Sequence, residues 1–283
     1  MKFLGTGAAE GIPNPFCNCR ICRSAREKKG REIRTRSSFM LNDKVIIDMG
    51  ADYFAQSVTL GVSFEKVEHI LFTHTHDDHF NYTLFWERFV AEKGAQSGLK
   101  VYMTDEAMGV IEDFYMHSRL TDGREEFIKN VDFVPMKYGE RYHIDSFLVM
   151  PLKGRHETSY EKNSANFLIE NRGKTLFYGL DSGCFLPETV SALAGKRLDA
   201  IITECTFPIE CGITEESSHM DLPMCVNNLD RLYSCNAIDS HTAVYLSHIG
   251  AFGMTHSELE AAAENIKRPY KIIVAFDGME LKM

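Results

Sequence analysis

Short apolar runs recur along the chain and alternate with turn residues and with segments of helical periodicity. The runs predict strands near 3–4, 38–41, 45–48, 69–73, 99–103, 131–133, 147–149, 167–169, 176–178, 200–202, 244–246 and 272–274. Several of them are continuous and rich in β-branched residues, which is typical of strands covered on both faces. Apolar positions at helical spacing predict helices over 52–60, 80–93, 105–119, 186–194, 221–235 and 256–266.

The predicted strands fall into two groups, and helices follow each group. This order predicts a mixed α/β (α+β) protein in which two sheets pack together and helices cover them. The sequence has no internal repeat, low-complexity tract or flexible linker, so we expect residues 1–283 to form a single domain. Pro187 is expected at a helix start, and Thr255 or Ser257 as the cap of the last helix.

The composition narrows the class of protein and its partners. The 283 residues include 40 Asp and Glu against 31 Lys and Arg, a formal net charge of −9. No apolar run approaches the roughly 18–20 residues of a membrane span, and the first residues do not resemble a signal peptide. We therefore predict a cytoplasmic protein, with a homodimer as one expected assembly. It should contact no membrane, and its acidity disfavours a large nucleic acid.

Basic residues are concentrated in one segment. Between Arg20 and Arg36 there are eight Lys and Arg and two Glu. A short charge run of this kind is usually a solvated surface segment. The alternative is a positive rim that attracts a small anionic substrate.

The strongest chemical signal is the segment His74-Thr75-His76-Asp77-Asp78-His79, directly after the predicted strand 69–73. His74, His76, Asp78 and His79 offer imidazole and carboxylate ligands at a strand end, where binding sites of layered α/β folds form. Such ligands suit zinc, manganese or iron. One loop cannot hold two ions alone. His156, Asp181 and His248 each follow a later apolar run and are candidates for the remaining ligands.

These residues resemble the metallo-β-lactamase superfamily. The resemblance rests on His-x-His-x-Asp-His at 74–79, on the three later ligands, and on Asp48, which is similar to the aspartate of the family's first motif. It implies a four-layer αββα sandwich with the site at one edge of the two sheets. It also implies that Asp48 supports the ligand loop without binding metal.

The resemblance further implies two divalent metal ions. One would be bound by His74, His76 and His156, and the other by Asp78, His79 and His248. Asp181 would bridge them, and Asp78 would also orient the nucleophile. Two such ions can hold a hydroxide at neutral pH and stabilise charge that develops on substrate oxygens.

Cysteines form a second cluster. Cys17, Cys19 and Cys22 lie within six residues, in a cysteine-rich N-terminal loop at about 11–36. Thiolates at this spacing can wrap one tetrahedral ion, so we expect a structural zinc.

This opening is similar to the branch of the superfamily that contains PhnP-type cyclic phosphodiesterases and PqqB-type proteins. In the phosphodiesterases, a histidine three residues beyond the last catalytic ligand completes the structural zinc site. That position here is Ala251. His256, Cys205, Cys211 and water are the alternatives for the fourth ligand.

The same branch implies a role for His219, in the segment 217–222. A histidine at this place protonates the leaving oxygen or binds the phosphate, and either role suits an imidazole near pH 7. A surface histidine at a helix start is the alternative interpretation.

Together these features predict a dinuclear metal-dependent hydrolase, with Asp78 and His219 as catalytic residues. We expect a phosphodiesterase that cleaves a small cyclic or nucleotide-like phosphodiester by attack of the metal-held hydroxide. One alternative is a thioester or lactone hydrolase that uses the same metal pair. Another is a non-catalytic carrier protein of the PqqB type. The carrier predicts no hydrolysis with metal fully loaded.

Overall fold

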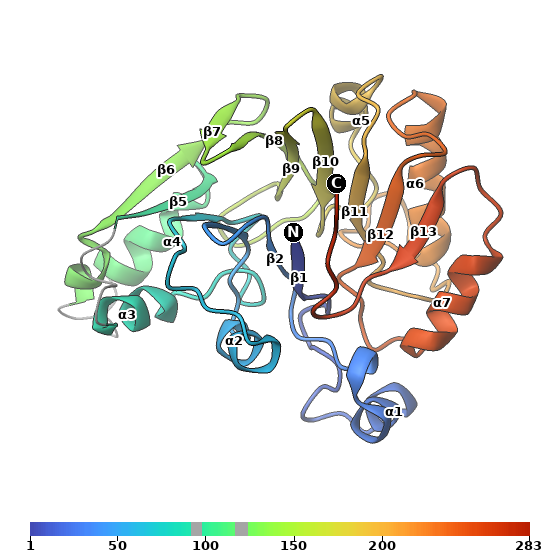
Figure 1. The fold of residues 1–283 in the computed structure, drawn as a ribbon, viewed down its shortest axis with the longest axis horizontal. Coiled ribbons are helices and arrows are strands. Elements are labelled where there is room, and N and C mark those ends of the chain that lie inside the picture. The colour runs from blue at the N-terminus through green and yellow to red at the C-terminus, as the bar shows by residue number, and fades with distance from the viewer. Residues whose placement is uncertain (92–97, 117–123) are drawn as a thin grey trace.

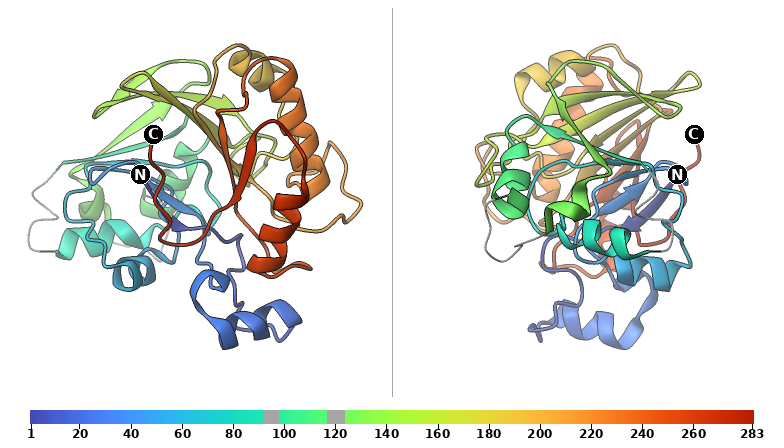
Figure 2. Two further views of the ribbon diagram at one scale, coloured as in Figure 1. Left: turned by 45° about the vertical axis from the view of Figure 1, so that its right-hand side comes forward. Right: turned by 90° about the vertical axis from the view of Figure 1, so that its left-hand side faces the viewer.

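The computed structural model describes residues 1–91, 98–116 and 124–283. Figures 1 and 2 show two β-sheets that face each other, with helices on their outer sides. Positions 92–93 of the predicted helix 80–93, and positions 117–119 of the predicted helix 105–119, lie outside the described residues. None of the helices in the described ranges has the length and apolar character needed to cross a lipid bilayer.

The first sheet has six strands in the order β1-β2-β3-β4-β5-β6. They are β1 (Lys2–Gly5), β2 (Ser38–Met40), β3 (Val45–Ile47), β4 (His69–Leu71), β5 (Leu99–Thr104) and β6 (Val131–Met136). The first three strands pair antiparallel, and β3 to β6 pair parallel. Asn42 stabilises the turn between β2 and β3, because its side-chain oxygen accepts from the N–H groups of Lys44 and Val45.

The second sheet has seven strands in the order β13-β12-β11-β10-β9-β8-β7. They are β7 (Tyr142–Ile144), β8 (Phe147–Lys153), β9 (Ala165–Asn171), β10 (Lys174–Gly179), β11 (Ala200–Glu204), β12 (Ala243–Ser247) and β13 (Lys271–Val274). Pairing is antiparallel from β7 to β10 and parallel from β10 to β13. Strands β8, β10, β11 and β12 therefore run in one direction, and their carboxyl ends meet at the same edge.

Apolar side chains from both sheets fill the space between them. Phe39 and Ile47 of the first sheet and Phe167 and Tyr178 of the second belong to one buried cluster. Burying a side chain of this size stabilises the fold by about 1.5–3 kcal/mol. This shared core holds the two sheets face to face.

Helices cover the outer faces of both sheets. On the first sheet these are α2 (Tyr53–Leu60), α3 (Thr83–Val90) and α4 (Met108–Ile111), which contribute Tyr53, Phe85 and Ile111 to a second core. On the second sheet, α5 (Pro187–Leu193) and α6 (Leu222–Ser234) pack through Leu193 and Leu229. α7 (His256–Asn265) packs beside β13. The predicted αββα sandwich is confirmed.

Helix starts follow local capping chemistry. Pro187 occupies the first turn of α5, as predicted. Of the two candidate caps for α7, Thr255 is the residue that acts: it forms a reciprocal capping box with Glu258.

Two segments differ from the sequence-based expectations. The cysteine-rich segment at 11–36 contains a helix, α1 (Arg20–Lys28), that the charge pattern concealed, because only Ile21, Cys22 and Ala25 of it are buried. The helix predicted over 105–119 is confirmed only in part: it begins at Met108, and after Ile111 it continues as a π-helical turn, Glu112–Met116. Figure 1 shows α1 standing out from the body of the sandwich.

Candidate metal centre

The predicted ligands meet at the edge where the strands end. Three histidine nitrogens form a first group. His76 Nδ1 lies 3.1 Å from His74 Nε2 and 3.0 Å from His156 Nε2. His74 and His76 follow β4, and His156 follows β8, so the two sheets contribute to one group. Two nitrogens bound to one tetrahedral zinc would lie about 3.3 Å apart, close to the separations seen here.

A second group lies beside the first. His79 Nε2 is 3.2 Å from Asp78 Oδ2, and His248 Nε2 is 3.5 Å from the same oxygen. Asp181 Oδ2 lies 2.7 Å from His79 Nε2 and 3.1 Å from His248 Nε2. Asp181 also belongs to candidate groups with His74 and with His156. It therefore lies between the two groups, at the place that the resemblance implies for a shared ligand.

The hydrogen bonds of four imidazoles fix which nitrogen faces the site. His79 Nδ1 donates to Asp48 Oδ2 at 2.7 Å. His248 Nδ1 lies 3.0 Å from Thr206 Oγ1, whose own proton goes to Glu204. His74 Nδ1 lies 3.0 Å from Thr73 Oγ1. These contacts make Nδ1 the N–H donor in each ring, so Nε2 presents a lone pair to the site.

His156 follows the same rule, because its Nδ1 lies 3.4 Å from the backbone oxygen of Ser218. His79 Nε2, His248 Nε2 and Asp181 Oδ2 are buried and have no hydrogen-bond partner of acceptable geometry. Unpaired lone pairs that converge in a buried site cost free energy unless a cation binds them. The donor set therefore fits divalent metal ions, and the oxygen partners at Nδ1 are those that metal-binding histidines use.

The charges of the ligands agree with this fit. Burial lowers the pKa of His74 well below its ordinary value and also lowers the pKa of His156, which keeps both rings neutral. Burial alone would raise the pKa of Asp181, but the facing rings of His248 and His79 hold it well below its usual range. His79 faces three carboxylates, which outweigh burial and raise its pKa well above the ordinary value. A field that favours a proton on His79 also favours a metal cation.

Asp48 anchors the ligand loop, as the resemblance implied. Its carboxylate accepts from His79 Nδ1 and from the N–H and hydroxyl of Thr73, at 2.8 and 2.9 Å. Asp48, Asp181 and His248 all have left-handed backbone, with φ of 59°, 44° and 50°. Such φ values cost about 1–3 kcal/mol per residue and cluster at functional sites. Here they turn the chain within two residues of the ends of β3, β10 and β12.

Glu204, at the end of β11, is the main residue that the sequence did not reveal. Its Oε1 accepts the N–H groups of Ser182 and Gly183, which follow Asp181. Its Oε2 lies 3.1 Å from His219 Nδ1. Burial opposes both charges, yet the pair attracts: the pKa of Glu204 is lowered to about 2, and Glu204 raises the pKa of His219 to about 9. One buried carboxylate thus positions the Asp181 turn and the predicted acid.

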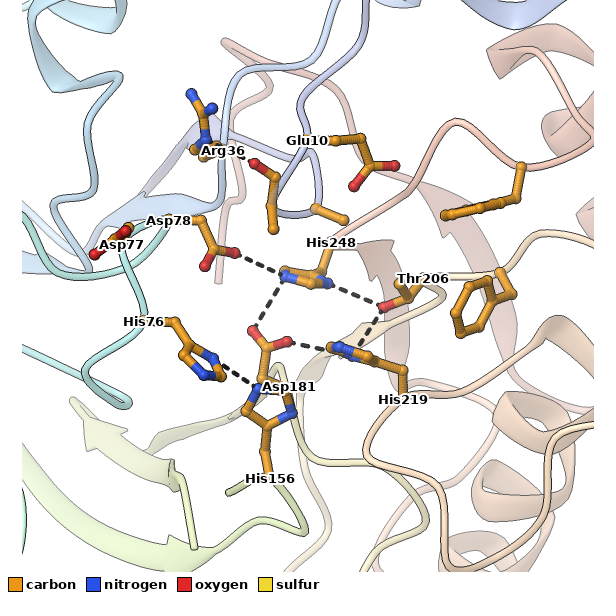
Figure 3. Close-up of a pocket in the computed structure, with 14 residues that line it drawn as sticks. Glu10, Arg36, His76, Asp77, Asp78, His156, Asp181, Thr206, His219 and His248 are labelled. Carbon is orange, nitrogen blue, oxygen red and sulfur yellow. Dashed lines mark hydrogen bonds and ion pairs between the residues drawn. The ribbon is translucent and has the colours of Figure 1, made fainter. Parts of the chain in front are cut away.

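A cavity of about 640 Å³ opens onto both groups, a size typical of small-molecule sites. Figure 3 shows His76, Asp78, His156, Asp181, His219 and His248 around it. Asp77, which the sequence left as a solvated residue, is an exposed lining residue. Gly50 is required below the site, because a methyl group there would overlap the backbone oxygen of Asp78.

The basic segment 20–36 does not form a positive rim. Of its eight Lys and Arg, only Arg36 lines the cavity. Arg20 pairs with Glu258, and Arg31 with Glu260. Arg34 is fully buried and donates to Thr6 and to the backbone oxygen of Ala275. Arg20, Arg31 and Arg34 therefore stabilise the fold through their partners. Of the two interpretations of the basic segment, a surface segment agrees better with the structure than a positive rim around the cavity.

The three predicted structural thiols lie together. The sulfur atoms of Cys17, Cys19 and Cys22 are all within 4.8 Å of one another, and Cys19 caps α1 by accepting from the N–H of Cys22. The nearest polar partners of His256 lie outside the cysteine group: Arg34 is 2.7 Å from its Nδ1, and Glu260 is 3.2 Å from its Nε2. Three thiolates suit zinc, with the fourth position left for another ligand or water.

Comparison with known proteins assigns the family. The sequence profile described as "Beta-lactamase superfamily domain" matches residues 43–267. The chain belongs to this superfamily, whose members are mostly hydrolases. Its two sheets and their helices have the metallo-β-lactamase fold, which implies divalent metal ions. The predicted family and fold are thereby confirmed.

Three solved structures resemble nearly the whole chain. A diphosphatase from the PhnP family has a TM-score of 0.73 at 20% identity, over 99% of this chain and 95% of that one. Zinc-bound PqqB from Methylobacterium extorquens has a TM-score of 0.76 at 18% identity, over 100% and 99%. The short form of human tRNase Z has a TM-score of 0.57 at 16% identity, over 98% and 96%. At these identities the likeness is one of fold.

One curated relative shares part of the sequence. An octanoyltransferase of Porphyromonas gingivalis (strain ATCC BAA-308 / W83) is 30% identical over 105 residues, which is 34% of this chain. The chain spans 20% of the length of that relative. The similarity therefore concerns one segment of a longer protein.

Proposed function

We propose that this protein is a dinuclear metal-dependent phosphodiesterase. His74, His76 and His156 would hold one ion, and Asp78, His79 and His248 the other, with Asp181 shared. The support is the set of four imidazoles whose Nδ1 atoms are occupied by oxygen partners and whose Nε2 atoms face the site. Zinc or manganese suits this donor set, and iron is the alternative.

When bound, such a pair supplies Lewis-acid chemistry: it lowers the pKa of a water molecule and stabilises negative charge on the substrate. The protein contributes the remaining groups. Asp78 orients the attacking water with its carboxylate. His219, which lies 3.3 Å from Asp181 and lines the cavity, gives its proton to the leaving oxygen. Glu204 holds His219 in place during this transfer.

The position of His219 bears on the choice of substrate. Its Nδ1 lies 3.1 Å from Glu204 Oε2, its ring lines the cavity, and the Glu204 carboxylate raises its pKa, which favours the proton-carrying form. An alkoxide is a poor leaving group and needs a proton, whereas a thiolate, with an ordinary pKa of about 8.5, leaves without one. A positioned cationic acid therefore favours a phosphodiester over a thioester. A carrier protein has no need of such an acid.

The first test compares substrates on the metal-loaded protein. We expect turnover of bis(p-nitrophenyl) phosphate to exceed turnover of a thioester. Dominant thioester turnover would contradict the proposal, and no hydrolysis of either substrate would favour a carrier.

The second test concerns the acid. His219→Ala should lower kcat on a diester with an alkyl leaving group by about 10²–10⁴-fold. The loss on a p-nitrophenyl diester should be smaller, because nitrophenolate needs less protonation. His241→Ala is the matched control, since His241 is exposed in the turn before β12. Equal losses on both diesters would contradict the role as acid.

For the N-terminal segment we propose a structural zinc bound by Cys17, Cys19 and Cys22. The support is their proximity at the start of α1, a helix with few buried residues of its own. A tetrahedral ion would hold this segment where the apolar core is small.

A further inference from the structure

A further buried carboxylate lies in one of the loops that carry the first group of histidines. Glu161 is 2% exposed and belongs to the loop between β8 and β9, which also carries His156. Burial raises the pKa of Glu161, and hydrogen-bond donors from Thr75, Thr158 and Thr104 oppose that rise. A carboxylate is costly in a buried position unless several donors satisfy it. The partners of Glu161 therefore indicate what it does.

One oxygen of Glu161 joins two loops. Its Oε2 accepts from the N–H of Thr75 at 2.9 Å and from the hydroxyl of Thr75 at 2.8 Å. The same oxygen accepts from the hydroxyl of Thr158 at 3.1 Å. Thr75 follows β4 of the first sheet, and Thr158 follows β8 of the second. A single buried atom therefore links the two sheets at the edge where the candidate metal ligands meet.

Both threonines are sequence neighbours of candidate ligands. Thr75 lies between His74 and His76. Thr158 comes two residues after His156. The three rings converge, because His76 Nδ1 lies 3.1 Å from His74 Nε2 and 3.0 Å from His156 Nε2. The carboxylate thus binds the chain next to every ligand of the first group, and it does so without contacting their rings.

The position of Glu161 is itself fixed. Its Oε1 accepts from the hydroxyl of Thr104, the last residue of β5, at 3.2 Å. Its N–H donates to Thr158 Oγ1 at 2.9 Å, and its backbone oxygen accepts from the N–H of Thr158 at 2.8 Å. The two loops therefore cannot shift relative to each other without breaking hydrogen bonds to a buried group. Ligands that such partners hold in place bind a metal ion more tightly than mobile ligands do.

We propose that Glu161 is a positioning residue for the first metal ion. It holds the loop that carries His76 and the loop that carries His156 at the separation that binding of one ion requires. The inference rests on the ligand sets of the proposed function and goes beyond them, because Glu161 acts through the two threonines and touches neither ion nor substrate. The property that matters is the place of its oxygen atoms, and not its charge.

Three variants of Glu161 separate position from charge. Glu161→Ala removes both oxygens, so the affinity of one ion of the metal centre should fall by about 10-fold, the lower end of the range for residues that orient metal ligands. Glu161→Gln keeps an oxygen for Thr75, and its NH₂ group can face the Thr104 hydroxyl, which accepts as well as donates. It should retain most of the affinity. Glu161→Asp keeps the charge but is one methylene shorter, so it should lose affinity as Glu161→Ala does.

Competition titration of the metal-free protein with Zn²⁺ and a chelating dye measures these affinities and identifies the ion. In His248→Ala, which removes a ligand of the second group, adding Glu161→Ala should still weaken the ion that remains at the first group. In His156→Ala, which removes a ligand of the first group, adding Glu161→Ala should leave the affinity of the remaining ions unchanged. Glu157→Ala, an exposed glutamate of the same loop, is the matched control and should leave all affinities within about 2-fold.

Near-ultraviolet circular dichroism checks that each variant is folded. A second link between the sheets remains in all of them, because the N–H of Ala165 donates to the backbone oxygen of Thr73 at 2.7 Å. Unchanged Zn²⁺ affinity in folded Glu161→Ala, an equal loss at both metal groups, or a loss in Glu161→Gln equal to that in Glu161→Ala would overturn this inference and leave the proposed function standing. If the unchanged protein bound no Zn²⁺ at its histidine groups, the proposed function and this inference would fail together.

Discussion

Asp48→Asn is the sharpest perturbation of the metal centre, because it changes one atom and leaves the shape of the side chain. In the protein Asp48 is fully buried and accepts from His79 Nδ1, at 2.7 Å, and from Thr73, at 2.8 and 2.9 Å. An asparagine has one acceptor oxygen and one donor nitrogen. Only one of the two neighbours can therefore keep its acceptor.

If the amide oxygen stays with the N–H of Thr73, the NH₂ group faces His79 Nδ1. His79 must then move its proton to Nε2, and the lone pair that faces Asp78 and Asp181 is lost. If the amide turns over, the N–H of Thr73 loses its acceptor in a buried position, which costs about 1–3 kcal/mol. Either arrangement weakens the second metal group.

The expected loss follows from the role of Asp48. Removing the hydrogen-bond partner of a metal-binding histidine lowers metal affinity about 10–100-fold, equivalent to about 1.4–2.7 kcal/mol. Competition titration with a chelating dye should show this loss for one of the two ions. The stability of the metal-free protein should change less, since His79 can then donate from Nε2 to Asp181.

A surface substitution of the same kind is the control. Asp43→Asn makes the same chemical change at an exposed hairpin residue, and it should leave metal affinity within about 2-fold. The reasoning is refuted if Asp48→Asn, folded by near-ultraviolet circular dichroism, binds both ions as tightly as the unchanged protein.

Three further predictions concern the metals and the acid. A chelator should lower Tm by several degrees, because ligand at about 100-fold over its Kd stabilises by about 2.7 kcal/mol; unchanged Tm would argue against the metal centre. Glu204→Gln removes the charge that raises the pKa of His219 to about 9. The alkaline limb of kcat should then move down by about 1 pH unit or more, measured in buffers of constant ionic strength. Cys19→Ser should remove about one zinc equivalent by elemental analysis while hydrolysis persists.

The pH dependence of stability follows from the same pair. Glu204 has its pKa lowered from 4.5, so its contribution is complete above 4.5 and is lost as pH falls toward about 2. His219 has its pKa raised from 6.5, so its contribution is complete below 6.5 and is lost as pH rises through about 9. The pair therefore stabilises the fold most between pH 4.5 and 6.5. Chemical denaturation across this range would measure it.

The candidate metal ligands could be located in the sequence because they are either close together in one loop or placed shortly after a strand. His74, His76, Asp78 and His79 follow β4 within one loop, and the later candidates His156, Asp181 and His248 each come within three residues of a strand end. A polar ligand after a buried strand is visible without the fold, since the strand ends define the edge where sites form. Geometry then adds what spacing cannot: the nitrogen that each ring presents.

Glu204 could not be predicted in this way. It ends β11 as a lone acidic residue after an apolar run, with no motif around it. Its role depends on the parallel register of β10 and β11, which sets Gly179 beside Thr203 and brings the turn after β10 to the Glu204 carboxylate. The contact between the rings of Phe207 and Phe252 could not be predicted either, because the two residues lie in loops 45 positions apart in the sequence. The sequence around a phenylalanine in a loop does not indicate which residue its ring contacts, because that depends on the fold.

Folding and metal binding are coupled in this architecture. Four buried carboxylates surround the site. His79 contacts three of them, Asp48, Asp78 and Asp181, and His219 contacts the fourth, Glu204. Taking a carboxylate out of water costs several kcal/mol unless opposite charge compensates it. In the metal-free protein the rings of His79 and His219, whose pKa values the carboxylates raise, supply part of this positive charge. Divalent cations would supply the rest. Metal binding should therefore raise the free energy of unfolding, and replacing one of these carboxylates should reduce that gain while it abolishes activity.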